Sequence, residues 1–112
     1  AKRVVALKAP GPFHSELMRP AAERFAEAVE ALELNDLRTP VLSCDGQTLL
    51  QEQDEVKREL VNQLTRPVRF RDAVHTLAAL GIEELAEVSP LSVLIPMARR
   101  CTRNLKFTLV SG

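Results

Sequence analysis

Residues 81–110 read GIEELAEVSPLSVLIPMARRCTRNLKFTLV, and this stretch decides the class of fold. Residues 84–89 favour a short strand, and residues 105–109 alternate apolar and polar side chains as a half-buried strand does. A helix is predicted between them with Ser92 as its N-cap, which places Pro96 at the fourth helical position, where no intrahelical hydrogen bond is lost. A strand, a helix and a second strand with short connections predict parallel pairing.

A first helix is predicted from about residue 16, with Ser15 as its N-cap. Pro20 fits this helix because it falls in or just past the first turn, where backbone N–H groups have no intrahelical partner. The apolar positions are spaced three and four apart, as on a single helical face. They are Leu17, Ala21, Phe25, Ala28, Val29 and Leu32.

Two more helices follow in the middle of the chain. The second helix takes Asp54 as its N-cap and ends before Pro67. The third covers residues 69–80 and is followed by Gly81, a typical residue just beyond a helix C-terminus. The apolar faces that predict them consist of Val56, Leu60 and Leu64 in one and of Phe70, Val74, Leu77 and Leu80 in the other.

Two strand-like stretches complete an alternation of strands and helices. Residues 3–9 are β-rich and end at a Pro-Gly-Pro sequence, and residues 39–44 form a short buried-strand candidate closed by a turn at Asp45-Gly46. The pattern predicts an α/β fold with a largely parallel sheet flanked by helices. About four strands are too few to make a doubly wound sheet with both faces covered, so the domain looks incomplete.

The composition is that of one soluble globular domain. The chain has 112 residues, of which 46% are hydrophobic and 27% charged, and its 15 basic and 15 acidic residues give a net charge of zero. This balance favours neither nucleic acid nor an anionic membrane as a partner. No apolar run is long enough for a membrane span and the first residues do not resemble a signal peptide, so the cytosol is the expected compartment.

The two cysteines, Cys44 and Cys101, lie far apart in the sequence. Neither has a second cysteine or a histidine at the spacing of a metal site. We expect two reduced, partly buried thiols, with no disulfide and no bound metal.

His14 lies between a Gly-Pro turn and the start of the first helix. The positive end of a helix dipole disfavours an imidazolium there, so a neutral imidazole that accepts a proton is expected at pH 7. Such a group can act as a general base. The alternative is a histidine that only ends a turn and bonds a carbonyl, and position alone leaves both possibilities open.

Three segments carry a resemblance to a known family: GPFHSELMRPAAERF at 11–25, ELVNQLTRPVRFRDAV at 59–74 and GIEELAEVSPLSVL at 81–94. In this order they resemble the C-terminal part of malonyl-CoA:acyl carrier protein transacylase, the acyltransferase of fatty-acid and polyketide synthesis. The resemblance implies that residues 1–10 are the last strand of a small ferredoxin-like subdomain. It implies that residues 11–112 are the C-terminal portion of a large hydrolase-like subdomain.

The resemblance also implies a site. In that family the histidine matching His14 is the catalytic base, and the residue matching Gln63 holds its imidazole through a main-chain carbonyl. Phe13 stands where modular relatives selective for malonyl groups have phenylalanine, which makes it the implied substrate-binding residue. Malonyl-CoA is the implied substrate and acyl carrier protein the acceptor, with no permanently bound cofactor.

The chain departs from the family pattern in what it lacks. Its four glycines, none of which brackets a serine, provide no Gly-x-Ser-x-Gly nucleophile elbow. The family's oxyanion glutamine and its malonyl-pairing arginine have no counterpart either. We therefore expect part of an enzyme, inactive alone, whose missing N-terminal part supplies these groups. The alternative is a non-catalytic acyltransferase-like module that docks a carrier protein or a partner domain.

The remaining charged residues are interpreted as solvent-exposed surface residues. His75 lies one residue off the apolar stripe of its helix and is expected to be an ordinary surface histidine. The acidic group at 83–87 has no basic partner at helical spacing, and a solvated face is expected. A basic cluster that could meet an acidic carrier protein is more simply a solvated helix end; it consists of Arg99, Arg100, Arg103 and Lys106.

Overall fold

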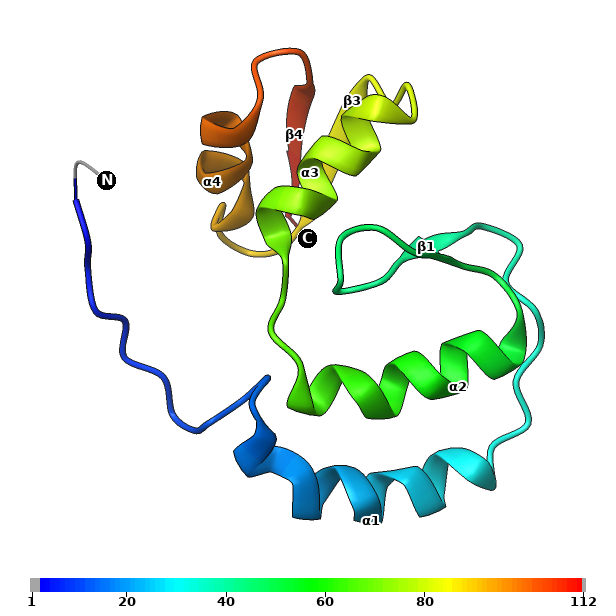
Figure 1. Cartoon of the computed structure of the whole chain (residues 1–112). Helices are drawn as coiled ribbons and strands as arrows, with labels where there is room; N and C mark the ends of the chain where they lie inside the picture. Colours follow the sequence, from blue (N-terminus) through cyan, green and yellow to red (C-terminus); the bar gives the residue numbers. More distant parts are fainter. Residues whose placement is uncertain (1–2, 112) are drawn as a thin grey trace.

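The computed structural model describes residues 3–111 and has an α/β fold with a parallel pair of strands flanked by helices, as predicted (Figure 1). Residues 1, 2 and 112, at the ends of the two predicted segments, lie outside the described residues. The elements are the 3₁₀ helix η1 (Glu16–Met18), α1 (Arg19–Glu30), β1 (Val41–Leu42), β2 (Leu49–Leu50), α2 (Gln53–Asn62), the 3₁₀ helix η2 (Gln63–Thr65), α3 (Phe70–Ala79), β3 (Glu84–Val88), α4 (Leu94–Cys101) and β4 (Lys106–Val110).

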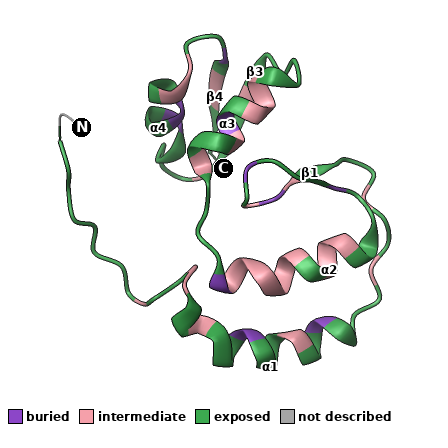
Figure 2. Cartoon of the chain, viewed as in Figure 1, coloured by how far each residue is buried: buried purple, intermediate pink, exposed green. Residues whose placement is uncertain are grey.

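Helices α1 and α2 lie side by side and antiparallel (Figure 1). The buried residues of α1 are Ala22 and Val29, and Val29 lies close to Lys57 and Val61 of α2. Purple, buried positions occur along α1 in Figure 2. The predicted apolar face of α1 is therefore wrong except at Val29. Small side chains let the two helices approach closely, whereas the larger Leu17 and Phe25 point outward and are 77% and 38% exposed.

Helix α2 begins one residue after Glu52, which is its N-cap. The Glu52 side chain accepts from the backbone N–H of Glu55, and the Glu55 side chain accepts from the backbone N–H of Glu52, which makes a capping box. The predicted N-cap at Asp54 is wrong, because the capping box satisfies the free N–H groups two residues earlier. Of the predicted apolar face, Val56 and Leu60 lie in α2 and Leu64 lies in η2, and all three are half-buried.

Strands β1 and β2 form a short antiparallel hairpin, with Val41 opposite Leu50. The strand predicted over residues 39–44 is shorter than expected and is not buried, since Val41 is 50% exposed. The turn at Asp45-Gly46 is confirmed: the Gly46 N–H donates to the Ser43 carbonyl at 3.0 Å, and Gly46 has a φ of 77°. Strand β2 is not among the elements predicted from the sequence.

The predicted strand–helix–strand unit at 84–110 is confirmed. Strands β3 and β4 pair in parallel, in register from Glu84 opposite Lys106 to Val88 opposite Val110. Helices α3 and α4 contribute Val74 and Ala98 to a buried core that also includes Leu105. The half-buried Leu85 and Phe107 pack against this core from the sheet, whereas Val88 is 81% exposed. One face of the two-stranded sheet is thus covered and the other is bare.

Helix α4 starts one residue later than predicted. Val93, not Ser92, is its N-cap, and Pro96 occupies the third helical position. The Glu87 carboxylate accepts hydrogen bonds from the backbone N–H groups of Val93, Leu94 and Ile95 at 3.0, 2.8 and 3.1 Å. Glu87 is therefore not the simply solvated side chain that was expected, because it satisfies the N–H groups that the first helical turn leaves unpaired.

The strand predicted over residues 3–9 is not formed in this structure. Residues 3–9 are exposed, have no strand assignment and extend away from the helices (Figure 1). A strand is stabilised by hydrogen bonds to a neighbouring strand, and no described residue supplies one here. The assignment of this segment to a small ferredoxin-like subdomain stays a prediction.

Candidate active site

His14 has an unusual backbone conformation. Its φ is 61°, and it is the one residue other than glycine between residues 3 and 111 with a positive φ. Histidine tolerates the left-handed region better than most residues, but the conformation is still disfavoured. Strain of this kind is retained where the surrounding structure enforces it, and such positions cluster at functional sites.

The turn that carries His14 is closed by its neighbours. The Ser15 hydroxyl donates to the Pro12 carbonyl at 2.6 Å, and the Met18 N–H donates to the Ser15 carbonyl at 3.0 Å. Ser15 precedes η1 as expected, but its side chain makes no capping hydrogen bond, so the predicted capping role is wrong. The hydroxyl instead bonds backward across His14 and closes the turn.

The structure brings His14 and Gln63 together across 49 positions of sequence. The imidazole Nδ1 lies 2.8 Å from the main-chain carbonyl oxygen of Gln63. A carbonyl oxygen only accepts, so Nδ1 carries the hydrogen and donates it. In the neutral imidazole, Nε2 is then left with a free lone pair, which is the form a general base requires.

The side chain of Gln63 is not part of this contact. Its Nε2 donates to the carbonyl of Leu60, near the end of α2, at 3.4 Å. Gln63 follows the last residue of α2 and opens η2, so its carbonyl lies at the end of a helical segment. Carbonyl groups in this position lack the donors that a continuing helix provides.

Phe13 lies next to His14 but turns toward Gly11. A Cβ built on Gly11 would lie 3.2 Å from the Phe13 ring, so the ring rests directly over this glycine. Phe13 is nevertheless 56% exposed. Its ring is thus accessible on the surface, one residue before His14 in the chain.

The sequence analysis did not predict the polar contacts between the hairpin and α2. The Glu59 carboxylate accepts from the Ser43 hydroxyl at 2.7 Å and from the Cys44 N–H at 2.9 Å. Partial burial, followed by the nearby Glu59 carboxylate, raises the pKa of the Cys44 thiol. A thiol with a raised pKa is a poor nucleophile at neutral pH, so Cys44 is not a substitute for a missing serine.

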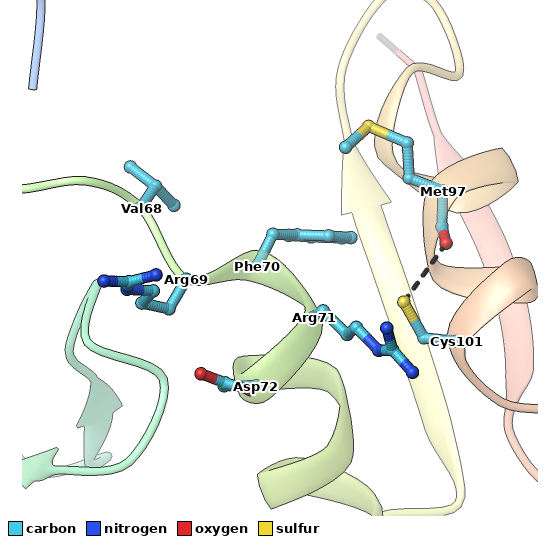
Figure 3. Close-up of a pocket in the computed structure, with 7 residues that line it drawn as sticks. All are labelled: Val68, Arg69, Phe70, Arg71, Asp72, Met97 and Cys101. Carbon is cyan, nitrogen blue, oxygen red and sulfur yellow. Dashed lines mark hydrogen bonds between the residues drawn. The ribbon is translucent and has the colours of Figure 1, made fainter. Parts of the chain in front are cut away.

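A separate pocket of about 450 Å³ lies between the start of α3 and helix α4 (Figure 3). The Cys101 thiol in it donates to the Met97 carbonyl at 3.4 Å. His14, Gln63 and Phe13 do not line this pocket. The lining residues are Val68, Arg69, Phe70, Arg71, Asp72, Met97 and Cys101.

Three further observations concern the described residues as a whole. Both cysteines are free, and each is partly buried. Within residues 3–111, no group of three or more histidine, cysteine, aspartate or glutamate side chains could hold a metal ion. Over the same range, every helix is too short or too polar to cross a membrane.

The parallel strand–helix–strand unit and the flanking helices define an α/β fold, in which the His14 imidazole binds a main-chain carbonyl. No protein-family model matches the chain. The malonyl CoA-acyl carrier protein transacylase of Bacillus subtilis (strain 168) is 39% identical over 111 residues, covering 99% of this chain and 35% of that protein.

The crystal structure of the malonyl-CoA:ACP transacylase of Synechocystis sp. PCC 6803 superimposes with a TM-score of 0.89 at 34% identity, covering 98% of this chain and 38% of the other. A malonyl-transacylase solved in complex with a type II polyketide synthase acyl-carrier protein has a TM-score of 0.85 at 29% identity, covering 93% and 34%. The chain is homologous, over almost its whole length, to the C-terminal portion of malonyl-CoA:acyl carrier protein transacylases. These homologues are acyltransferases, and the chain spans about a third of their length.

Proposed function

We propose that this chain is the C-terminal part of a malonyl-CoA:acyl carrier protein transacylase, in which His14 is the general base. The observation that carries the proposal is the 2.8 Å contact between His14 Nδ1 and the Gln63 carbonyl. This contact leaves Nε2 as the free nitrogen, and the left-handed backbone of His14 supports a fixed orientation of its side chain. Homology to transacylases supports the reaction class.

The proposed reaction is a double displacement. A serine from the remainder of the enzyme attacks the malonyl thioester while His14 Nε2 accepts the serine proton, and His14 then returns that proton to the departing coenzyme A sulfur. The pantetheine thiol of acyl carrier protein attacks the resulting malonyl-serine ester, with His14 accepting the thiol proton and giving it back to the serine oxygen. No resident cofactor is needed for either half-reaction.

We assign to the Gln63 carbonyl the role that an aspartate has in a serine triad. It fixes which ring nitrogen bears the hydrogen and stabilises the imidazolium that forms when Nε2 takes a proton. Phe13, the residue before His14, is proposed to line the acyl site. The chain has no serine between glycines, so the nucleophile comes from the N-terminal part of the enzyme.

A chimeric enzyme tests this function. This chain replaces the matching C-terminal portion of the Bacillus subtilis relative, and transfer of malonyl from coenzyme A to acyl carrier protein is measured. The control is the N-terminal portion of the relative without this chain. We expect transfer only when the chain is present. A chimera that folds cooperatively and binds carrier protein, but transfers no malonyl group, would instead support a non-catalytic docking module.

A further inference from the structure

Pro67 lies four residues after Gln63. In a continuing α-helix the N–H of residue 67 would donate to the carbonyl of residue 63. Proline has no N–H, so the Gln63 carbonyl does not receive this hydrogen bond. The acceptor that His14 uses is thus free of its ordinary helical donor because of the residue type at position 67.

Pro67 also acts on the residue before it. A residue that precedes proline is disfavoured in the α region, and Arg66 has a φ of −118° and a ψ of 144°. The chain therefore leaves the helical conformation immediately after η2, which ends at Thr65. Both effects of the proline keep the Gln63 carbonyl at a helix end, where His14 Nδ1 meets it at 2.8 Å.

We infer that Pro67 is a positioning residue for His14. By withholding a competing N–H and ending the helical segment, Pro67 reserves the Gln63 carbonyl as the acceptor for His14 Nδ1–H. This fixes the Nδ1–H tautomer and keeps Nε2 unprotonated in the neutral ring. The catalytic value of this arrangement rests on the proposed function of His14, but the tautomer itself depends only on contacts within this chain.

The other histidine provides an internal reference. The Nε2 of His75 lies 3.1 Å from the Cys101 carbonyl oxygen, so its hydrogen is on Nε2. The two histidines are therefore held in opposite tautomers by two carbonyl groups. A substitution that affects only the Gln63 carbonyl changes the tautomer of His14 alone, whereas general unfolding changes the tautomers of both histidines.

The tautomers are measured by nitrogen-15 NMR of the histidine side chains in the whole chain, at mildly alkaline pH. The variants are Pro67→Ala, which restores the N–H and favours a longer helix, and Pro67→Gly, which restores the N–H with less helical bias. Pro40→Ala, at an exposed proline ahead of β1, is the matched control.

In the unmodified chain and in Pro40→Ala, His14 is expected as the Nδ1–H form and His75 as the Nε2–H form. In Pro67→Ala the Nδ1–H to Nε2–H ratio of His14 is expected to fall about fivefold or more, which is the effect of losing one hydrogen bond on such an equilibrium. The tautomer of His75 is expected to stay unchanged. In Pro67→Gly the tautomer ratio of His14 is expected to change in the same direction. This variant is used for the test if Pro67→Ala does not fold.

An unchanged His14 tautomer in a folded Pro67 variant would overturn the inference. That result would mean that other contacts, such as the bond from the Arg69 N–H to the Cys44 carbonyl at 2.8 Å, end the helix regardless of residue 67. The outcome is independent of transacylase activity. If the chimera is inactive but the tautomer shifts as expected, the proposed function fails while the role of Pro67 stands.

Discussion

The backbone at His14 occupies a region that costs about 1–2 kcal/mol for an L-residue. Two contacts offset this cost within the described residues: the Ser15 hydroxyl closes the turn onto Pro12, and the imidazole binds the Gln63 carbonyl. The strained turn points the side chain of His14 toward the end of α2 instead of along η1. The conformation therefore links a local turn to a contact with a residue 49 positions away.

At the residue scale, the resemblance predicted the pairing of His14 with Gln63, and the structure places the two groups in contact. Their chemical roles remain predictions. The positive φ of His14 and the backward bond of Ser15 could not be predicted. A serine before a helix is typically an N-cap, and only the geometry of the Pro12 turn directs its hydroxyl elsewhere.

Phe13 is expected to favour malonyl over methylmalonyl groups in the complete enzyme. Phe13 directly precedes His14 and its ring is exposed. In the complete enzyme this ring is expected to occupy space that an α-methyl group needs, a difference typically worth about 10- to 200-fold. Phe13→Ser in the chimera is expected to narrow the ratio of the kcat/KM values for the two thioesters. An unchanged ratio would place selectivity elsewhere, and equal loss of both activities would mean that Phe13 mainly supports His14.

At the scale of elements, the turn at Gly46 joins the hairpin to α3. A Cβ on Gly46 would lie 2.7 Å from the backbone nitrogen of Ala73 and 2.8 Å from the carbonyl oxygen of Arg69. The Thr76 hydroxyl donates to the Gly46 carbonyl at 2.5 Å. Only a residue without a side chain permits this close contact, so the hairpin and α3 are held together at Gly46.

Gly46→Ala is therefore expected to destabilise the fold more than Gly81→Ala. Both glycines have positive φ values, 77° and 86°, but a Cβ on Gly81 has no atom within 4 Å. The backbone cost is shared, so the difference of about 1–3 kcal/mol in unfolding free energy reports the steric contact at Gly46 alone. Urea denaturation of the two variants measures this difference. Equal destabilisation would show that the close contact at Gly46 adds no steric cost.

The Glu87 carboxylate makes the start of α4 sensitive to acid. Hydrogen bonds from the backbone N–H groups of Leu94, Val93 and Ile95 lower the pKa of Glu87 below its ordinary value. A lowered pKa gives stability that is fully present above the unfolded-state value of about 4.3 and is lost as pH falls through the folded-state value. Glu87→Gln is expected to speed amide hydrogen exchange at Leu94 and Ile95 near neutral pH and to reduce their acid dependence.

Glu83→Gln is the matched control for this prediction, because Glu83 lies on the same stretch and its side chain makes none of these bonds. Exchange in this variant should match the unmodified chain. If Glu87→Gln also leaves the two amides as protected as before, the first turn of α4 is held by packing and not by the carboxylate.

The sequence predicted elements best where the pattern was local. The unit from β3 to β4 followed from alternation and helical spacing within 30 residues. The buried face of α1 could not be predicted in this way, because α1 has apolar residues on two sides. Only its packing against α2 determines that Ala22 is buried and Phe25 is exposed. The β1–β2 hairpin has two residues per strand, too few for a periodic signal.

At the scale of the whole molecule, the chain exposes more surface than a compact domain does. Its accessible surface is 8998 Å², against roughly 6,100 Å² expected for a compact monomer of this size. Its radius of gyration is 15.8 Å, against about 13 Å. Most of the chain is exposed in Figure 2, and the bare face of the sheet includes Val88. Apolar surface of this extent favours association.

Sedimentation velocity at several concentrations is therefore expected to show self-association or an expanded species. The unpaired edges of β3 and β4 and the outward apolar face of α1 are the surfaces that would associate. A compact monomer at all concentrations would show that the small core around Val74 is enough to hold the chain together without further contacts.

The central claim, that His14 is the base of an acyl transfer, is tested most directly by the rate at which the chimera becomes labelled with radioactive malonyl-CoA in a single turnover. His14→Ala is expected to slow formation of the malonyl-serine ester by about 10²- to 10⁴-fold. His75→Ala should leave the rate unchanged, and the chain alone should stay unlabelled. Labelling of the folded His14→Ala chimera at the unmodified rate would contradict the account.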